Sequence, residues 1–93
     1  MQEDLKWQRY LDQARSGDPS ALGELLDELK DRLARQCQQG ISAADRSDIV
    51  QQSMLSACRA FNRFEGDQVG QFIEWVDAIH RRNLMDAGRK RRH

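Results

Sequence analysis

The stretch from residue 18 to residue 39, DPSALGELLDELKDRLARQCQQ, carries the clearest structural pattern in this chain. Its apolar residues are mostly three or four apart, so they fall on one side of a helix. Asp18 is a good N-cap, Pro19 suits the first helical position, and Gly40 is the left-handed residue expected after the helix. We therefore expect a helix over residues 19–39. Its buried stripe consists of Leu22, Leu25, Leu26, Leu29, Leu33 and Cys37.

The same spacing predicts helices on both sides of this stretch. Trp7, Tyr10, Leu11 and Ala14 form the apolar side of a short N-terminal helix that stops at residues 16–17. A third helix begins near Asp45, which can cap it, and Phe64 closes the segment. A fourth runs over about residues 71–86, and its apolar side holds Phe72, Val76, Ile79 and Asn83.

The predicted fold class is therefore all-α. We expect one compact bundle of three long helices over residues 18–93, preceded by the short helix in residues 1–17. The 93 residues suffice for one small domain, and 39% of them are hydrophobic. No apolar run approaches the ~20 residues of a membrane span, and the acidic start is unlike a basic signal peptide. The expected location is cytoplasmic.

Catalytic and metal chemistry have little support in the sequence. Cys37 and Cys58 lack metal-ligand spacing and fall on predicted apolar stripes, which favours buried structural thiols. His80 and His93 lie in basic stretches, and we expect His80 on a polar face or lining a groove. No nucleophile–His–acid set or Gly-rich phosphate loop occurs. We expect no enzyme activity, metal or cofactor.

The net charge of zero conceals an asymmetry along the chain. Residues 1–52 carry a net charge of −3, and residues 53–93 carry +3. The basic end could face a polyanion, or it could only complement the dipole of a helix C-terminus. Both interpretations remain open on charge alone.

Two surfaces remain as candidates for function. The outer side of the third helix exposes a mixed polar stripe, which suits either a docking face or an ordinary solvated face. That stripe consists of Asp45, Asp48, Gln51, Gln52, Leu55 and Arg59. The fourth helix and its preceding loop interleave aromatic and basic residues, as single-strand binders do, although the aromatic residues could equally pack in the core. That set consists of Phe64, Phe72, Trp75, Arg63, Arg81, Arg82 and Arg89.

The sequence around these two surfaces resembles that of a known protein family. The run DRSDIVQQSM at residues 45–54, continued to Phe64, resembles region 2 of bacterial extracytoplasmic-function sigma factors, whose pattern is D-x-x-D-L-V-Q-E-x-F-L-x-A-W-x-x-x-x-x-F. Residues 72–83 resemble the F-x-x-W-L-x-x-I-A-x-N segment, and Asp86, Arg89 and Arg92 resemble the D-x-x-R-x-x-R ending. Residues 14–25 are similar to the opening A-x-x-G-D-x-x-A-F-x-x-L. The resemblance covers nearly the whole chain.

The resemblance implies a transcription initiation role. The third helix would dock on the clamp helices of the largest subunit of bacterial core RNA polymerase, through Asp48, Ile49, Gln51, Gln52 and Leu55. The domain would melt the minus-ten promoter element and capture one flipped base of the non-template strand in a pocket of the loop at residues 64–71. The residues implied in DNA binding are Phe64, Gly66, Asp67, Trp75, Arg82, Asn83, Arg89 and Arg92. An anti-sigma factor is a further partner that the resemblance allows.

The sequence also departs from the family pattern. Gln52 replaces the usual acid, and the aromatic residue commonly found near Cys58 is missing. The helix-turn-helix domain that reads the minus-35 element does not follow, which we interpret as a region-2 fragment rather than a reduced relative. Two alternatives stay open: a sigma-like module that binds polymerase or an anti-sigma regulator without DNA, and a generic basic-helix nucleic-acid binder.

Overall fold

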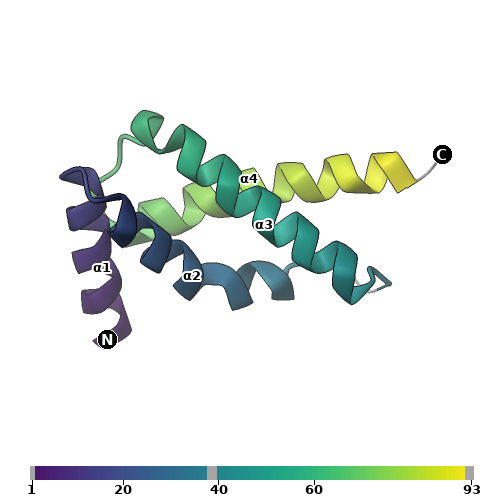
Figure 1. Cartoon of the computed structure of the whole chain (residues 1–93), viewed down its shortest axis with the longest axis horizontal. Coiled ribbons are helices and arrows are strands. Elements are labelled where there is room, and N and C mark those ends of the chain that lie inside the picture. Colours follow the sequence, from purple (N-terminus) through teal and green to yellow (C-terminus); the bar gives the residue numbers. More distant parts are fainter. Residues whose placement is uncertain (1, 38–39, 92–93) are drawn as a thin grey trace.

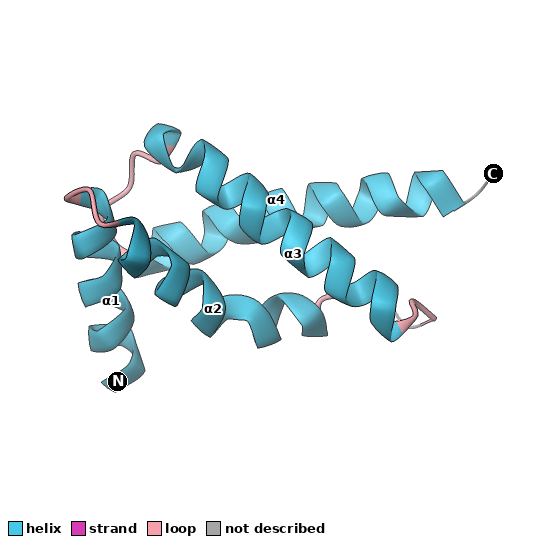
Figure 2. Cartoon of the chain, viewed as in Figure 1, coloured by secondary structure: helices cyan, strands magenta, loops and turns pink. Residues whose placement is uncertain are grey.

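Four α-helices follow one another in the computed structural model, which describes residues 2–37 and 40–91. They are α1 (Gln2–Arg15), α2 (Pro19–Arg35), α3 (Ala43–Ala60) and α4 (Val69–Arg91), with a 3₁₀ turn, η1 (Phe61–Arg63), after α3. Figure 2 shows only helices and loops across the described residues. The prediction of an all-α chain is confirmed.

The helices pack in two main pairs. α1 packs on α2, and α3 packs on α4, while α2 also contacts α3 (Figure 1). α1 stands across one end of the bundle, near the start of α4. The last turns of α4 extend beyond the other helices at the opposite end. The chain therefore has one covered end and one projecting helix terminus.

The leucine stripe of α2 forms the centre of the core, as its spacing predicts. Leu25, Leu29 and Leu33 are at most 1% exposed. Burying a leucine side chain contributes about 1.5–3 kcal/mol, so α2 anchors the other three helices. The core is completed by Leu11 and Ala14 of α1, Val50 and Ala57 of α3, and Phe72 and Val76 of α4.

Asp18 caps α2 as predicted. Its carboxylate accepts hydrogen bonds from the backbone N–H groups of Ser20 and Ala21, at 3.0 and 3.4 Å. Pro19 is the first helical residue, and Gly17 before it has a φ of +105°, which a glycine adopts without strain. The α1–α2 turn is therefore fixed by local sequence.

Several predicted helix ends are wrong. α2 ends at Arg35, so Gly40, although its φ is +93°, is not the residue that directly follows this helix, and residues 38–39 lie outside the described chain. α3 begins at Ala43 because the Ser42 hydroxyl caps it, accepting from the backbone N–H of Asp45 at 3.1 Å. Asp45 consequently lies in the first turn and is not the cap. The serine was the better cap since its side chain reaches the third helical N–H.

α4 is longer than predicted, whereas α1 (Gln2–Arg15) lies within the predicted residues 1–17. α4 runs from Val69 through Gly88 to Arg91. A glycine in a helix interior costs only about 1 kcal/mol relative to alanine, and the arginines and lysine after Gly88 are good helix formers. Gly88 therefore does not end α4.

The prediction of two buried cysteines is also wrong. Cys37 is half-buried and Cys58 is exposed, and both are free thiols. Cys58 lies at the margin of the α3 stripe, next to the fully buried Ala57. A position one residue beyond the stripe turns about 100° away from it, which places Cys58 outside the core.

Candidate docking face and nucleic-acid groove

Four of the five residues implied in polymerase docking share the outer face of α3. Asp48, Gln51 and Gln52 are exposed, and Leu55 is 55% exposed although it is a large apolar residue. Ile49 is different: it is 5% exposed and belongs to the buried side with Val50. Its assignment as a docking contact is therefore corrected, because its side chain is occupied inside the protein. We call the other four residues the α3 face.

An aromatic cluster joins the end of α3 to the start of α4. The rings of Phe64 and Trp75 lie 5.3 Å apart between centroids, and Phe72 lies 5.5 Å from Phe64 and 5.8 Å from Trp75. Phe61 stacks on Phe64 at 6.1 Å. Phe72 is fully buried, whereas Phe64 and Trp75 are half-buried. Phe72 is therefore a core residue, while Trp75 keeps part of its surface accessible.

A groove between α3 and α4 brings together three of the residues implied in DNA binding. Trp75, Arg82 and Asn83 line it from α4. Ser56 and Ala60 of α3, with Ala78 and Ile79 of α4, complete its walls. Its volume of about 380 Å³ lies within the range of small-ligand sites, about 300–1,000 Å³. We call this hollow the α3–α4 groove.

The loop before α4 is held closely by two glutamines that sequence reasoning missed. Gln8 of α1 donates to the Asp67 carbonyl oxygen at 2.8 Å and accepts from the Val69 N–H at 2.9 Å. Gln71 Oε1 accepts from the N–H groups of Asp67 and Gln68, at 3.0 and 3.1 Å. The Gln8 contacts connect residues about sixty positions apart, which no local pattern marks, whereas the Gln71 contacts span only three and four residues. Side chains of α1 and α4 therefore hold this loop in place.

Gly66 packs tightly inside this loop. A Cβ added at Gly66 would meet Phe64 Cζ at 2.7 Å and Gln71 Oε1 at 2.8 Å. The space beside Gly66 is therefore already filled by neighbouring side chains. None of residues 64–71 lines the α3–α4 groove; Phe64 only contacts Trp75, which does line it. Asp67 is exposed at the outer surface of the loop.

α4 contributes a basic residue to the groove. Arg81 and Arg82 are exposed, and Arg82 lines the groove. Arg89 lies in α4, although its side chain is outside the described part, and Arg92 is outside the described residues altogether. The described arginines carry positive charge that suits phosphate groups, and the groove beside Arg82 includes the aromatic Trp75.

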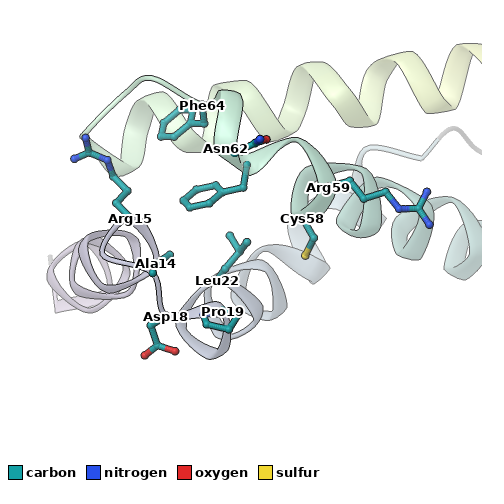
Figure 3. Close-up of a pocket in the computed structure, with 11 residues that line it drawn as sticks. Ala14, Arg15, Asp18, Pro19, Leu22, Cys58, Arg59, Asn62 and Phe64 are labelled. Atoms are coloured by element: carbon teal, nitrogen blue, oxygen red, sulfur yellow. The ribbon is translucent and has the colours of Figure 1, made fainter.

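A second hollow lies on the other side of Phe64. Its volume is about 560 Å³, and Figure 3 shows it between the α1–α2 turn and the end of α3. Leu22, Pro19 and Phe64 face it, together with the Cys58 thiol. Although Cys58 is exposed, partial desolvation by its neighbours raises the pKa of its thiol, which therefore stays protonated at neutral pH. This hollow offers an apolar wall rather than a reactive nucleophile.

His80 does not lie on an exposed or groove-lining surface, as the sequence suggested. It is 0% exposed, and its two ring nitrogens bond to Ser53 Oγ at 2.6 Å and to the Leu33 carbonyl oxygen at 2.7 Å. Burial lowers the pKa of His80, while the Leu33 hydrogen bond and nearby Asp77 oppose that shift. The amide of Asn83 donates to Ser53 Oγ at 3.1 Å. His80 is therefore part of a buried polar network beneath the groove.

No group of three or more His, Cys, Asp or Glu side chains within the described part of the chain is arranged to hold a metal ion. None of its helices has the length and apolarity to cross a membrane. Comparison with models of protein families, with curated proteins and with solved structures finds no match for this chain. The functional assignment therefore depends on the α3 face, the aromatic cluster and the α3–α4 groove.

Proposed function

We propose that this chain is a sigma-like transcription initiation domain. The α3 face docks on the clamp helices of bacterial RNA polymerase, and the α3–α4 groove receives an unpaired base of the non-template strand at the minus-ten element. The observation that carries the proposal is the convergence of Trp75, Arg82 and Asn83 in one groove beside the aromatic cluster. The sequence resemblance to region 2 supplies the identity of the partners.

The groove has the chemistry that an unpaired base requires. The half-buried Trp75 contributes part of an aromatic side chain, and Ile79 and Ala60 contribute apolar walls. Stacking on an aromatic side chain contributes about 1–3 kcal/mol per base, which offsets much of the few kcal/mol that unstacking costs. Arg82 at the margin can hold a backbone phosphate without reading sequence.

The same helix links the two proposed activities. Ser56 and Ala60 of α3 line the groove, whereas Asp48, Gln52 and Leu55 lie on its exposed face. A partner bound to the α3 face would thus hold the groove at a fixed position relative to itself. Such tethering raises the effective concentration of DNA near a domain that binds it weakly on its own.

Binding to purified bacterial core RNA polymerase tests the docking part. We expect Asp48→Arg to abolish binding, because it reverses the charge of the one charged residue of the α3 face. Asp27→Arg is the matched control, since Asp27 is an exposed acid on α2. Equal binding by wild type and Asp48→Arg, or none by wild type, would refute docking through α3.

Binding of a single-stranded oligonucleotide with a minus-ten sequence, in the presence of core polymerase, tests the groove. We expect Trp75→Ala and Arg82→Ala each to weaken binding and promoter opening, with Arg9→Ala on α1 as the control for an exposed arginine. If both groove variants open promoters like wild type while Asp48→Arg still loses polymerase, the chain is an interaction module without DNA recognition.

A further inference from the structure

We propose that His80 is a pH-sensitive lock that joins α4 to α3 only while its imidazole is neutral, while its hydrogen bond to α2 remains in both protonation states. The proposal concerns the bundle itself and does not depend on a nucleic-acid ligand. It rests on a network of four groups from three helices that meet inside the protein.

The hydrogen bonds assign a single tautomer to the ring. The Leu33 carbonyl oxygen can only accept, so His80 Nε2 carries a hydrogen and donates to it at 2.7 Å. In the neutral ring Nδ1 is then an acceptor, and the Ser53 hydroxyl donates to it at 2.6 Å. Asn83 in turn donates to Ser53 Oγ, which accepts this bond while donating its own hydrogen. Both ring nitrogens of His80 and the hydroxyl of Ser53 therefore have hydrogen-bond partners.

Protonation would break this arrangement at one atom. A hydrogen on Nδ1 would point at the Ser53 hydroxyl, whose own hydrogen would have to find another acceptor. The Ser53 and His80 side chains are both 0% exposed, so water is not at hand to satisfy the displaced hydrogen. The cation would also be buried, and an uncompensated buried charge is costly.

The charged groups around the ring counterbalance each other. On α4, Asp77 lies one turn before His80 and favours the cation. On α2, Arg32 binds Asp77 through Nη2 at 2.7 Å and Nε at 3.3 Å, which reduces the influence of the carboxylate on the ring. The Cys37 thiol on the same side approaches the Leu33 carbonyl oxygen at 3.8 Å. From α3 the ring meets the neutral hydroxyl of Ser53.

The lock also connects the core to the α3–α4 groove. Asn83 lines the groove and is held by the hydroxyl that donates to His80. Because Leu33 lies in the last turn of α2, His80 also caps a carbonyl of that helix end. Protonation therefore disturbs the α3–α4 contact at Ser53, the hydroxyl to which Asn83 is also bonded, whereas the Nε2 hydrogen bond to Leu33 of α2 persists.

Urea unfolding of the full chain between pH 5.5 and 7.5 tests the lock. A lowered pKa in the folded state means that the unfolded chain binds the proton first, so stability is full above about pH 6.5 and falls toward acid pH. In wild type we expect the folding equilibrium constant to fall by up to about tenfold per pH unit below that value. His80→Gln keeps one donor and one acceptor but cannot titrate, and should remove this dependence. His93→Gln, which changes the second histidine of the sequence, should leave it intact.

A second measurement tests the proposed role of His80 if the His80→Gln variant does not fold. Nitrogen-15 NMR of wild type at pH 7.5 should show His80 protonated at Nε2 alone, and the side-chain amide of Asn83 should shift as the ring titrates. A wild-type slope that survives in His80→Gln, a slope lost in His93→Gln, or a ring protonated at Nδ1 at pH 7.5 would each overturn the lock.

Discussion

From Val69 to His80, α4 packs Phe72, Val76 and His80 into the bundle with 0% exposure, whereas from Arg81 onward it turns arginines and Met85 outward. Met85 is 63% exposed. Figure 1 shows why: the last turns of α4 extend beyond the helices that cover its first half. A continuous helix therefore serves two purposes, since its first half stabilises the fold and its second half presents a basic surface.

The difference between the two halves of α4 shows that helical periodicity and burial are separate properties. Helical periodicity predicts a helix through both halves of α4, but a residue of α4 is buried only where another helix packs beside it. The groove lies at the boundary, where Trp75 and Ile79 of the first half meet Arg82 and Asn83 of the second. Variants in each half should consequently report on different quantities.

The largest expected effect is the loss of Phe72. Phe72→Ala removes a fully buried ring from the aromatic cluster and should lower the free energy of unfolding by about 3–5 kcal/mol. Met85→Ala in the second half is the control and should change it by less than about 0.5 kcal/mol. Urea denaturation measures both. Similar losses for the two variants would contradict the division of α4.

Substitutions at two glycines compare the packed loop before α4 with the projecting end of α4. Gly66→Ala should destabilise by about 1–3 kcal/mol, because the new Cβ would lie 2.7 Å from Phe64 Cζ and 2.8 Å from Gln71 Oε1, an oxygen fixed by two hydrogen bonds. Gly88→Ala in the projecting half meets nothing within 4 Å and should stabilise the helix by up to about 1 kcal/mol. Thermal unfolding of both variants measures the difference in sign. If Gly66→Ala left the thermal stability unchanged, the loop would have shifted to accommodate the added methyl group.

An ion pair fastens the first half of α4 to α2 and should make stability acid-sensitive. Burial acts to raise the pKa of Asp77, but hydrogen bonds from Arg32 and Gln36 outweigh it, so the pKa lies below its usual value of 3.8. The stabilisation is therefore present above about pH 4 and is lost as the pH falls through the lowered value.

Asp77→Asn should cost about 1 kcal/mol at pH 7, since Arg32 is nearly half exposed and the pair is screened by solvent. The variant should also lose less stability than wild type between pH 4 and more acidic conditions. Glu74→Gln, an exposed acid on the same half of α4, is the control. Chemical denaturation over this pH range measures the free energy of unfolding of each variant. The same loss of stability with falling pH in wild type and Asp77→Asn would contradict the role of the Arg32–Asp77 ion pair.

The sequence predicted much of the fold because its signals are local. The leucine stripe of α2 and the Asp18 cap depend on residues within a few positions of each other, and both are confirmed. His80 shows where the prediction was wrong: it continues the series Phe72, Val76 at intervals of four, yet its residue type suggested a surface. Only the distant acceptor at Leu33 makes a buried histidine acceptable there.

The candidate site shows the same limit. Trp75, Arg82 and Asn83 could be predicted to share a surface, since Arg82 and Asn83 follow Trp75 by seven and eight residues on one helix, and they do line one groove. Gln8 could not be predicted, because it braces the loop from α1, about sixty residues away along the chain. Ile49 was misassigned since a motif places it beside Asp48, whereas its rotation about the helix axis directs it inward.

The smallest expected effect on stability comes from the second half of α4, where the proposed function lies. Arg82→Ala should change the free energy of unfolding by less than about 0.5 kcal/mol, because Arg82 is exposed. Its effect should appear in single-strand affinity, measured over a range of salt concentrations with core polymerase present. Each lost phosphate contact lowers the slope of log affinity against log salt by about 1, so Arg82→Ala should flatten that dependence while Arg9→Ala leaves it unchanged. A wild-type affinity that does not depend on salt would contradict a basic groove, and a large stability loss in Arg82→Ala would mean that the second half of α4 also holds the fold together.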